Sequence, residues 1–187
     1  MRFHAAAGGV LSSLGMYLIR ARKVDAVLHI KASTDNPPLS EAWISRTEQD
    51  VYDGAQSRYG PGASLTAVHR LLDEGATFAV IGKPCDVAAI RNLQTIDERA
   101  KVQIPYCLTL FCGGTLSLKS VHAMVEGMGA APDELSLYRY RGEGWPGTAH
   151  METSDGRAFD LTYEQAWLDD TVPWKYDLPF RCKVCPD

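Results

Sequence analysis

Hydrophobic positions along the chain repeat in two ways. In residues 8–22 and 65–75 they recur at the 3.6-residue spacing of a helix, whereas residues 24–30 and 77–82 form short apolar runs typical of buried strands. Helical and strand-like segments of this kind alternate from residue 24 to residue 129. The alternation predicts an α/β fold, a mixed sheet with flanking helices and at least some parallel pairing.

The hydrophobic pattern changes after Pro132. Residues 134–162 alternate apolar and polar side chains, and the sequences GEGWPG and SDGR interrupt the alternation as turn signals. We therefore expect a small antiparallel β excursion near residues 134–162. The final segment contains aromatic residues and prolines but shows no period.

Length and composition bound the class of protein. The 187 residues fit a single domain, which we divide into an N-terminal part, about 1–55, and a C-terminal part, 56–187. Hydrophobic residues make up 45% and charged residues 22%, as in soluble globular proteins, and the longest apolar runs are too short to span a membrane. The net charge is −4 and the 19 basic residues are scattered, which argues against a nucleic-acid partner.

The N-terminal segment lacks the continuous apolar core of a signal peptide, so we expect a cytoplasmic protein. In that compartment five cysteines favour reduced thiols or metal ligands over disulfides.

Four of these cysteines lie at positions that suit a metal site. Cys85 and Cys112 follow predicted strands at their C-terminal ends, and Cys182 and Cys185 form a C-x-x-C pair. Ligand crevices form at such strand ends in open α/β sheets, and four thiolates serve both zinc and iron–sulfur clusters. Taken singly, a cysteine at a strand end is more often a small buried hydrophobe. Cys107 lies within a predicted strand, and we expect it to pack in the core.

The combination of motifs is more specific than the spacing of the cysteines. Over nearly the whole chain it resembles the beta-subunit family of coenzyme F420 hydrogenases and dehydrogenases, which also includes F420-dependent sulfite reductase modules and ferredoxin-dependent reductases of chlorophyll metabolism. The segments that carry the resemblance are AGGVLSSLGMYL, KVDAVL, SRYGPG, FAVIGKPCDVAAIRNL, FCGG, YRGEGWPG and RCKVCPD.

The resemblance implies an oxidoreductase that carries FAD and a [4Fe-4S] cluster and passes electrons between a one-electron carrier and a two-electron acceptor such as coenzyme F420. It implies that Cys85, Cys112, Cys182 and Cys185 bind the cluster. The expected partners are a redox protein or subunit, of ferredoxin or hydrogenase/dehydrogenase type, and a small-molecule electron acceptor. No residue selects the acceptor, and no catalytic residue is assigned.

The flavin contacts are expected at turns and helix starts. The backbone amides behind the paired glycines would receive a pyrophosphate, and the SRYGPG turn would lie against the flavin ring. Each feature also has a plain structural explanation, namely a helix start, a turn or a solvated cation. Trp145 would either cover a ring system or pack a hairpin turn, and the histidines are interpreted as structural. The expected cofactor-binding residues are Gly8, Gly9, Ser12, Ser57, Tyr59, Gly60, Lys83 and Arg91.

Two departures from the family pattern leave alternatives open. Ala7 replaces the serine that relatives commonly carry before the two glycines, and relatives continue well beyond the C-x-x-C pair and often begin earlier. A structural zinc-binding module and a truncated, non-catalytic member of the family are therefore the competing hypotheses.

Overall fold

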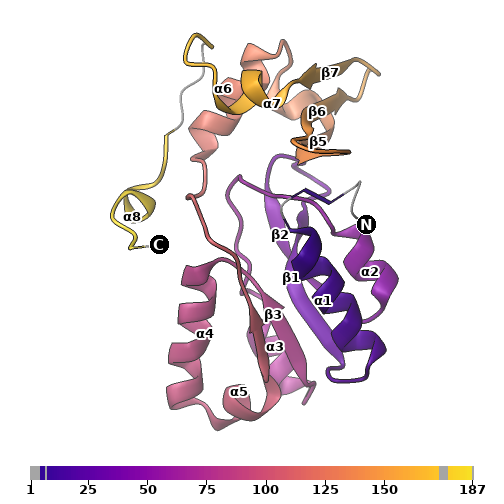
Figure 1. The fold of residues 1–187 in the computed structure, drawn as a ribbon, viewed down its shortest axis with the longest axis vertical. Coiled ribbons are helices and arrows are strands. Elements are labelled where there is room, and N and C mark those ends of the chain that lie inside the picture. The colour runs from indigo at the N-terminus through magenta and orange to yellow at the C-terminus, as the bar shows by residue number, and fades with distance from the viewer. Residues whose placement is uncertain (1–4, 7, 173–176, 187) are drawn as a thin grey trace.

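The computed structural model describes residues 5–6, 8–172 and 177–186, so Ala7 lies outside the described part. Its first sheet is mixed (Figure 1). The central strand β1 pairs with β2 antiparallel and with β3 parallel, and β3 pairs with β4 parallel. In spatial order the strands are β2 (Ser40–Ser45), β1 (Ala26–Ala32), β3 (Phe78–Ile81) and β4 (Tyr106–Leu108).

Helices cover both faces of this sheet. Because side chains alternate along a strand, Leu28 of β1 packs on one face and Val27 on the other. The Leu28 face is covered by α3 (Val68–Asp73), α4 (Pro84–Ile96) and α5 (Glu98–Gln103). The Val27 face is covered by α1 (Gly9–Arg20) and α2 (Glu48–Asp53). The two apolar faces explain why β1 and β3 appear in the sequence as nearly continuous hydrophobic runs.

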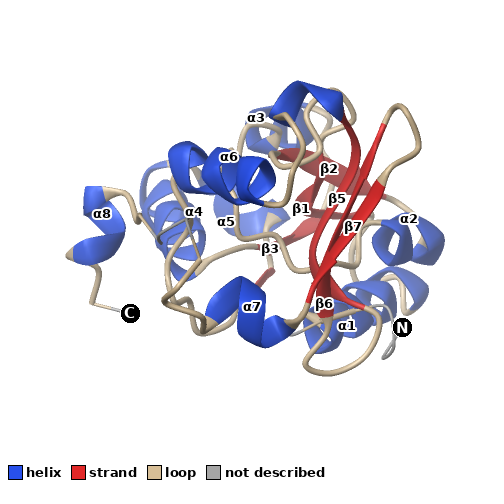
Figure 2. Cartoon of the chain, turned by 90° about the horizontal axis from the view of Figure 1, so that it is seen from above, coloured by secondary structure: helices blue, strands red, loops and turns tan. Residues whose placement is uncertain are grey.

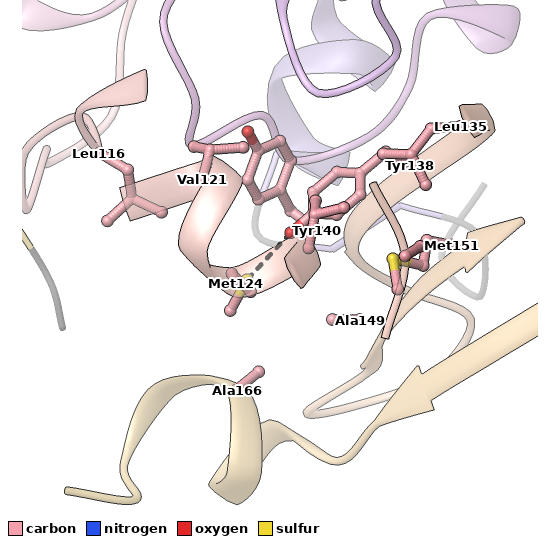
Figure 3. Close-up of a cluster of buried hydrophobic side chains, with 11 residues drawn as sticks. Leu116, Val121, Met124, Leu135, Tyr138, Tyr140, Ala149, Met151 and Ala166 are labelled. Carbon is pink, nitrogen blue, oxygen red and sulfur yellow. Dashed lines mark hydrogen bonds between the residues drawn. The ribbon is translucent and has the colours of Figure 1, made fainter. Parts of the chain in front are cut away.

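A second, antiparallel sheet lies beside the first unit with its own helices (Figure 2). Its core is closed by aromatic and sulfur-containing side chains, and Tyr138 Oη donates a hydrogen bond of 2.9 Å to Met124 Sδ (Figure 3). The elements of this unit are α6 (Leu118–Gly127), the 3₁₀ turn η1 (Pro132–Glu134), β5 (Leu135–Gly142), β6 (Thr148–Thr153), β7 (Ala158–Leu161) and α7 (Tyr163–Trp167).

The C-terminal segment carries one more short helix, α8 (Phe180–Lys183), which stands apart from both sheets in Figure 1. Asp177, just before it, is tied to the start of α6. Ser117 N donates to Asp177 O at 2.8 Å, and Asp177 N donates to Ser120 Oγ at 2.7 Å. These bonds place α8 next to the loop that joins β4 to α6.

The predicted α/β class and the antiparallel excursion are confirmed, since the second sheet spans residues 135–161. The predicted strand that contains Cys107 and was expected to end just before Cys112 is shorter, because β4 ends at Leu108, where Gly82 N donates the last ladder bond to Leu108 O at 3.1 Å. The division near residue 55 stays a prediction. In the part of the chain that the structure describes, no helix is long and apolar enough to cross a membrane.

Candidate functional site

The parallel strands β1, β3 and β4 end at one edge of the first sheet, and the loops that follow β3 and β4 hold two of the predicted ligands. Cys85 lies in the first turn of α4, directly after Pro84, whose fixed φ suits the first helical position. Asp86 fixes this turn, because its Oδ2 accepts hydrogen bonds from Lys83 N at 2.9 Å and from Lys83 Nζ at 2.7 Å. The turn therefore presents Cys85 at the sheet edge.

All four predicted ligands line one cavity of about 160 Å³ at this edge. Cys85 comes from the start of α4, Cys112 from the loop after β4, Cys182 from α8 and Cys185 from the residues after it. The other lining residues are Lys83, Pro84, Gly113, Gly114, Thr115 and Arg181. The structure thus brings together segments about 100 residues apart in sequence, although the role of the cysteines as metal ligands stays a prediction.

The loop after β4 is shaped by a glycine. Gly114 has φ +108°, and a Cβ there would lie 3.0 Å from Leu178 Cδ1 and 3.7 Å from the Cβ of Cys182. The absence of a side chain therefore lets α8 approach the loop. Gly114 N also donates a hydrogen bond of 3.4 Å to Cys112 Sγ. Hydrogen bonds of this kind to a ligating sulfur tune the potential of a cluster.

The cysteines differ in exposure. Cys85 and Cys185 are exposed, whereas Cys112 and Cys182 are partly buried. Partial burial raises the pKa of Cys85 above its usual value, and the nearby Asp86 carboxylate raises it further by a smaller amount. Cys107, in β4, packs against the core under α3 and α4, as predicted, and burial raises the pKa of its thiol.

The four thiols surround a space instead of meeting at a point. Among the described residues, no three His, Cys, Asp or Glu side chains are gathered closely enough to hold a single metal ion. The cavity between the cysteines is nevertheless open, and thiol groups border it from three separate segments.

A larger cavity of about 190 Å³ adjoins the first one. It lies at the carboxyl ends of β1 and β3 and extends to the start of α1 and to the segment before α3. Of the predicted flavin contacts, five line it: Gly8, Ser12, Ser57, Tyr59 and Lys83.

The other three predicted contacts lie outside the lining of this cavity. Gly9 is the first residue of α1, next to Gly8. Gly60 faces Tyr140 and Pro38, so it serves packing. Arg91 is exposed on α4 and donates to Gln94 Oε1 at 2.8 Å. Trp145, for which two roles were open, is 89% exposed in the turn between β5 and β6.

The sequence interpretation missed several polar residues that line the larger cavity, among them Arg58 and His29. Arg58 lies inside the SRYGPG motif, between the predicted flavin contacts Ser57 and Tyr59. Its positive charge was the feature that could have identified it. Its guanidinium donates to Ser40 Oγ at 3.2 Å and stands over the Tyr140 ring, 5.1 Å from the centroid.

His29 was interpreted as structural because the histidines have no mutual spacing that suggests a metal site. Its Nδ1 donates to Ile30 O at 3.0 Å, since a carbonyl can only accept, and Nε2 therefore accepts from Ser45 Oγ at 2.7 Å. Burial lowers the pKa of His29, so the ring contributes a neutral wall to the cavity.

Known proteins share this arrangement of elements. The chain is 29% identical over 122 residues to the F420-dependent formate dehydrogenase subunit beta of Methanocaldococcus jannaschii, a match that covers 65% of this chain and 32% of the relative. A chain of the F420-reducing [NiFe] hydrogenase complex from Methanosarcina barkeri, solved as a xenon derivative, superposes with a TM-score of 0.64 at 19% identity, covering 87% of this chain and 56% of that one. The chain thus spans about a third of the curated relative and just over half of the solved one.

Family models account for nearly all of the sequence. Residues 1–69 match the N-terminal model of the coenzyme F420 hydrogenase/dehydrogenase beta subunit, and residues 75–187 match the C-terminal model of the same subunit. The second model alone covers more than half of the chain and includes all four predicted ligands. The chain belongs to the coenzyme F420 hydrogenase/dehydrogenase beta subunit family.

Proposed function

We propose that the chain is an electron-transfer subunit of an oxidoreductase that binds a [4Fe-4S] cluster in the smaller cavity and FAD in the larger one. The observation that carries the proposal is the adjacency of the two cavities. One is bordered by all four predicted thiol ligands, and the other by five of the predicted flavin contacts.

The donor set suits an iron–sulfur cluster. Four cysteine thiolates are the usual ligands of a [4Fe-4S] cluster, and here the cysteines come from the first turn of α4, the loop after β4, α8 and the residues after it. A structural zinc ion would instead draw four sulfurs to about 2.3 Å from one point. Four thiolates serve either group, so the metal content of the purified chain decides between a cluster and a zinc ion.

The larger cavity suits part of a flavin. Its wall combines apolar side chains with a few polar groups, which is the usual composition of a cofactor pocket. Gly8 and Ser12 lie at the amino end of α1, where no acidic side chain occupies the first turn, so backbone amides there would receive a phosphate. At about 190 Å³ the cavity is smaller than a whole dinucleotide requires, so FAD would extend beyond it.

The cluster and the FAD together would link one-electron transfer to two-electron transfer, because a cluster moves single electrons and a flavin accepts two. The residues of the chain bind and orient them. Arg58 and Lys83 bring positive charge to the flavin cavity, and Asp86 pairs with Lys83. The solvent-exposed Cys85 and Cys185 mark the side from which a one-electron carrier, a ferredoxin or a partner subunit, would approach. Coenzyme F420 is the proposed two-electron acceptor, on the strength of the relatives' names.

The test is an anaerobic visible spectrum with iron, zinc and flavin quantified per chain. We expect about four iron atoms and one FAD per chain, with a brown-yellow colour. A colourless protein with one zinc ion per chain would instead establish the structural zinc module. A folded chain that takes up neither group after reconstitution would establish the non-catalytic member of the family.

A further inference from the structure

The two cavities share a wall. Of the residues that border them, five border both: Lys83, Cys112, Gly113, Gly114 and Thr115. Among the four cysteines, only Cys112 reaches the larger cavity, while the other three border the smaller one alone. Any group in the larger cavity therefore meets the cysteine site through the loop that carries Cys112.

Gly113 lies in the middle of this wall, and no contact among the described residues requires a glycine there. Its backbone lies outside the left-handed region that favours glycine, and no atom of the described residues lies within 4 Å of the position a Cβ would take. The neighbouring Gly114 differs from Gly113, because its φ is positive and an added Cβ there would lie 3.0 Å from Leu178 Cδ1. A glycine costs conformational entropy on folding, so one that is needed neither for backbone nor for packing indicates close approach by something else.

We infer that Gly113 is a positioning residue, which keeps open the space where the flavin ring lies against the Cys112 side of the cluster. The inference rests on the proposed function and adds the point of contact between the two groups. Electrons would enter at the exposed Cys85 and Cys185 side and leave at Cys112. Each transfer oxidises the cluster by one electron and reduces the flavin by one, and two transfers with two protons from solvent complete the reduction. A reduced ferredoxin-type carrier supplies the electrons.

The variant Gly113→Val tests the inference, because it places a branched side chain where an added Cβ meets no described atom within 4 Å beyond its chain neighbours. We expect unchanged iron content, a flavin dissociation constant raised roughly tenfold or more, as for an overpacked site, and slower flavin reduction even at saturating flavin. Flavin affinity is measured by fluorescence titration, and the order of cluster and flavin bleaching by anaerobic stopped flow with reduced ferredoxin.

Ala88→Val is the matched control, because Ala88 is exposed on α4 and outside both cavities. It should behave as the wild type in iron content, flavin affinity and transfer rate. Gly113→Ala provides a milder change if the valine variant fails to fold by circular dichroism, and it should shift the same quantities less.

Two results would overturn the inference while leaving the proposed function intact. One is a Gly113→Val protein with wild-type flavin affinity and transfer rate, and the other is loss of iron together with flavin, which would show that the new side chain disturbs the smaller cavity instead of the flavin ring. A wild-type chain that binds neither iron nor flavin would overturn the proposed function, and this inference with it.

Discussion

Arg58 Nη1 donates a hydrogen bond of 2.8 Å to the main-chain oxygen of Tyr138, 80 residues further along the chain. The bond joins the turn that borders the larger cavity to β5, the first strand of the second sheet. The same guanidinium donates to Leu39 O at 2.7 Å and to Pro37 O. One side chain thus holds the loop after β1, the cavity wall and the second sheet together.

Replacing Arg58 with Gln should lower the free energy of unfolding by about 1–3 kcal/mol, because partly buried carbonyl acceptors lose their donors. Urea denaturation of the cofactor-free chain measures the change. Arg70→Gln is the control, since the Arg70 side chain is 67% exposed and such surface pairs contribute little. Equal stability of the two variants would mean that the Arg58 contacts do not hold the sheets together.

Gly60 should matter for stability and not for flavin chemistry, although the motif first suggested a flavin contact. A Cβ at residue 60 would clash with Tyr140 Oη and lie 2.7 Å from Pro38 O, the atom to which Tyr140 Oη donates. Gly60→Ala should therefore cost about 1–3 kcal/mol by overpacking. Gly8→Ala, where no described atom lies within 4 Å of the new Cβ, is the control for stability. Thermal unfolding of the flavin-free proteins would contradict the expectation if both alanines melted alike.

The fold could be predicted where hydrophobic spacing has a single cause. The segments that became β1, β3 and α6 bury apolar positions in a core, so their periods appear in the sequence, whereas α1 buries Leu18 and leaves Val10, Leu14 and Tyr17 exposed. The apolar run after β4 had another cause. Leu110 and Phe111 line the larger cavity instead of pairing in the sheet, so the predicted strand was too long. Short helices such as α5, with 6 residues, and α8, with 4, are too brief to show a period.

The site was predictable to the extent that local rules determine it. Cys85 and Cys112 were placed at one sheet edge because parallel strands share their carboxyl ends. The role of Arg58 depends on Tyr138, and the ring of His29 is held by Ser45 of the neighbouring strand. These contacts exist only after folding brings distant segments together, so no local sequence pattern predicts them.

The iron content of alanine variants can be compared between the predicted ligand cysteines and Cys107. Cys85→Ala and Cys112→Ala should each abolish iron binding, because a cluster with three thiolates from the chain loses a ligand at the sheet edge. Cys107→Ala should keep the iron content of the wild type and cost about 1 kcal/mol of stability, as expected for a small half-buried side chain. Iron per chain after anaerobic reconstitution decides the matter. Retention of iron by Cys112→Ala would remove that residue from the ligand set.

His150 should make stability depend on pH near neutrality. Burial opposes its charge, but Nδ1 lies 2.9 Å from Asp160 Oδ1 and Nε2 lies 3.1 Å from Glu152 Oε1, and these carboxylates outweigh both burial and Arg139 to raise the pKa of the ring. A histidine with a raised folded-state pKa contributes stability that is complete below its unfolded pKa of about 6.5 and is lost as pH rises through the folded value.

His150→Gln should therefore lose more stability at pH 5.5 than at pH 8.5, relative to wild type. Urea unfolding across that range provides the measurement, and His69→Gln, at an exposed position on α3, is the control. A constant difference between His150→Gln and wild type at all pH values would mean that the ring does not gain its proton through folding.

Cys182 and Cys185 provide the last prediction, because contacts of their segment with the rest of the described chain gather at its start. Asp177 is held by Ser117 and Ser120, and Leu178 packs beside Gly114. Beyond Pro179, every described side chain except that of Cys182 is exposed, including Phe180 at 77% and Val184 at 62%. Little packing therefore orders residues 180–186, and metal binding by Cys182 and Cys185 would be coupled to the order of this segment.

Hydrogen exchange should show residues 180–186 protected in the reconstituted protein and unprotected after chelation, while Asp177 and Leu178 change less. Equal protection of 180–186 in both samples would show that packing alone holds Cys182 and Cys185.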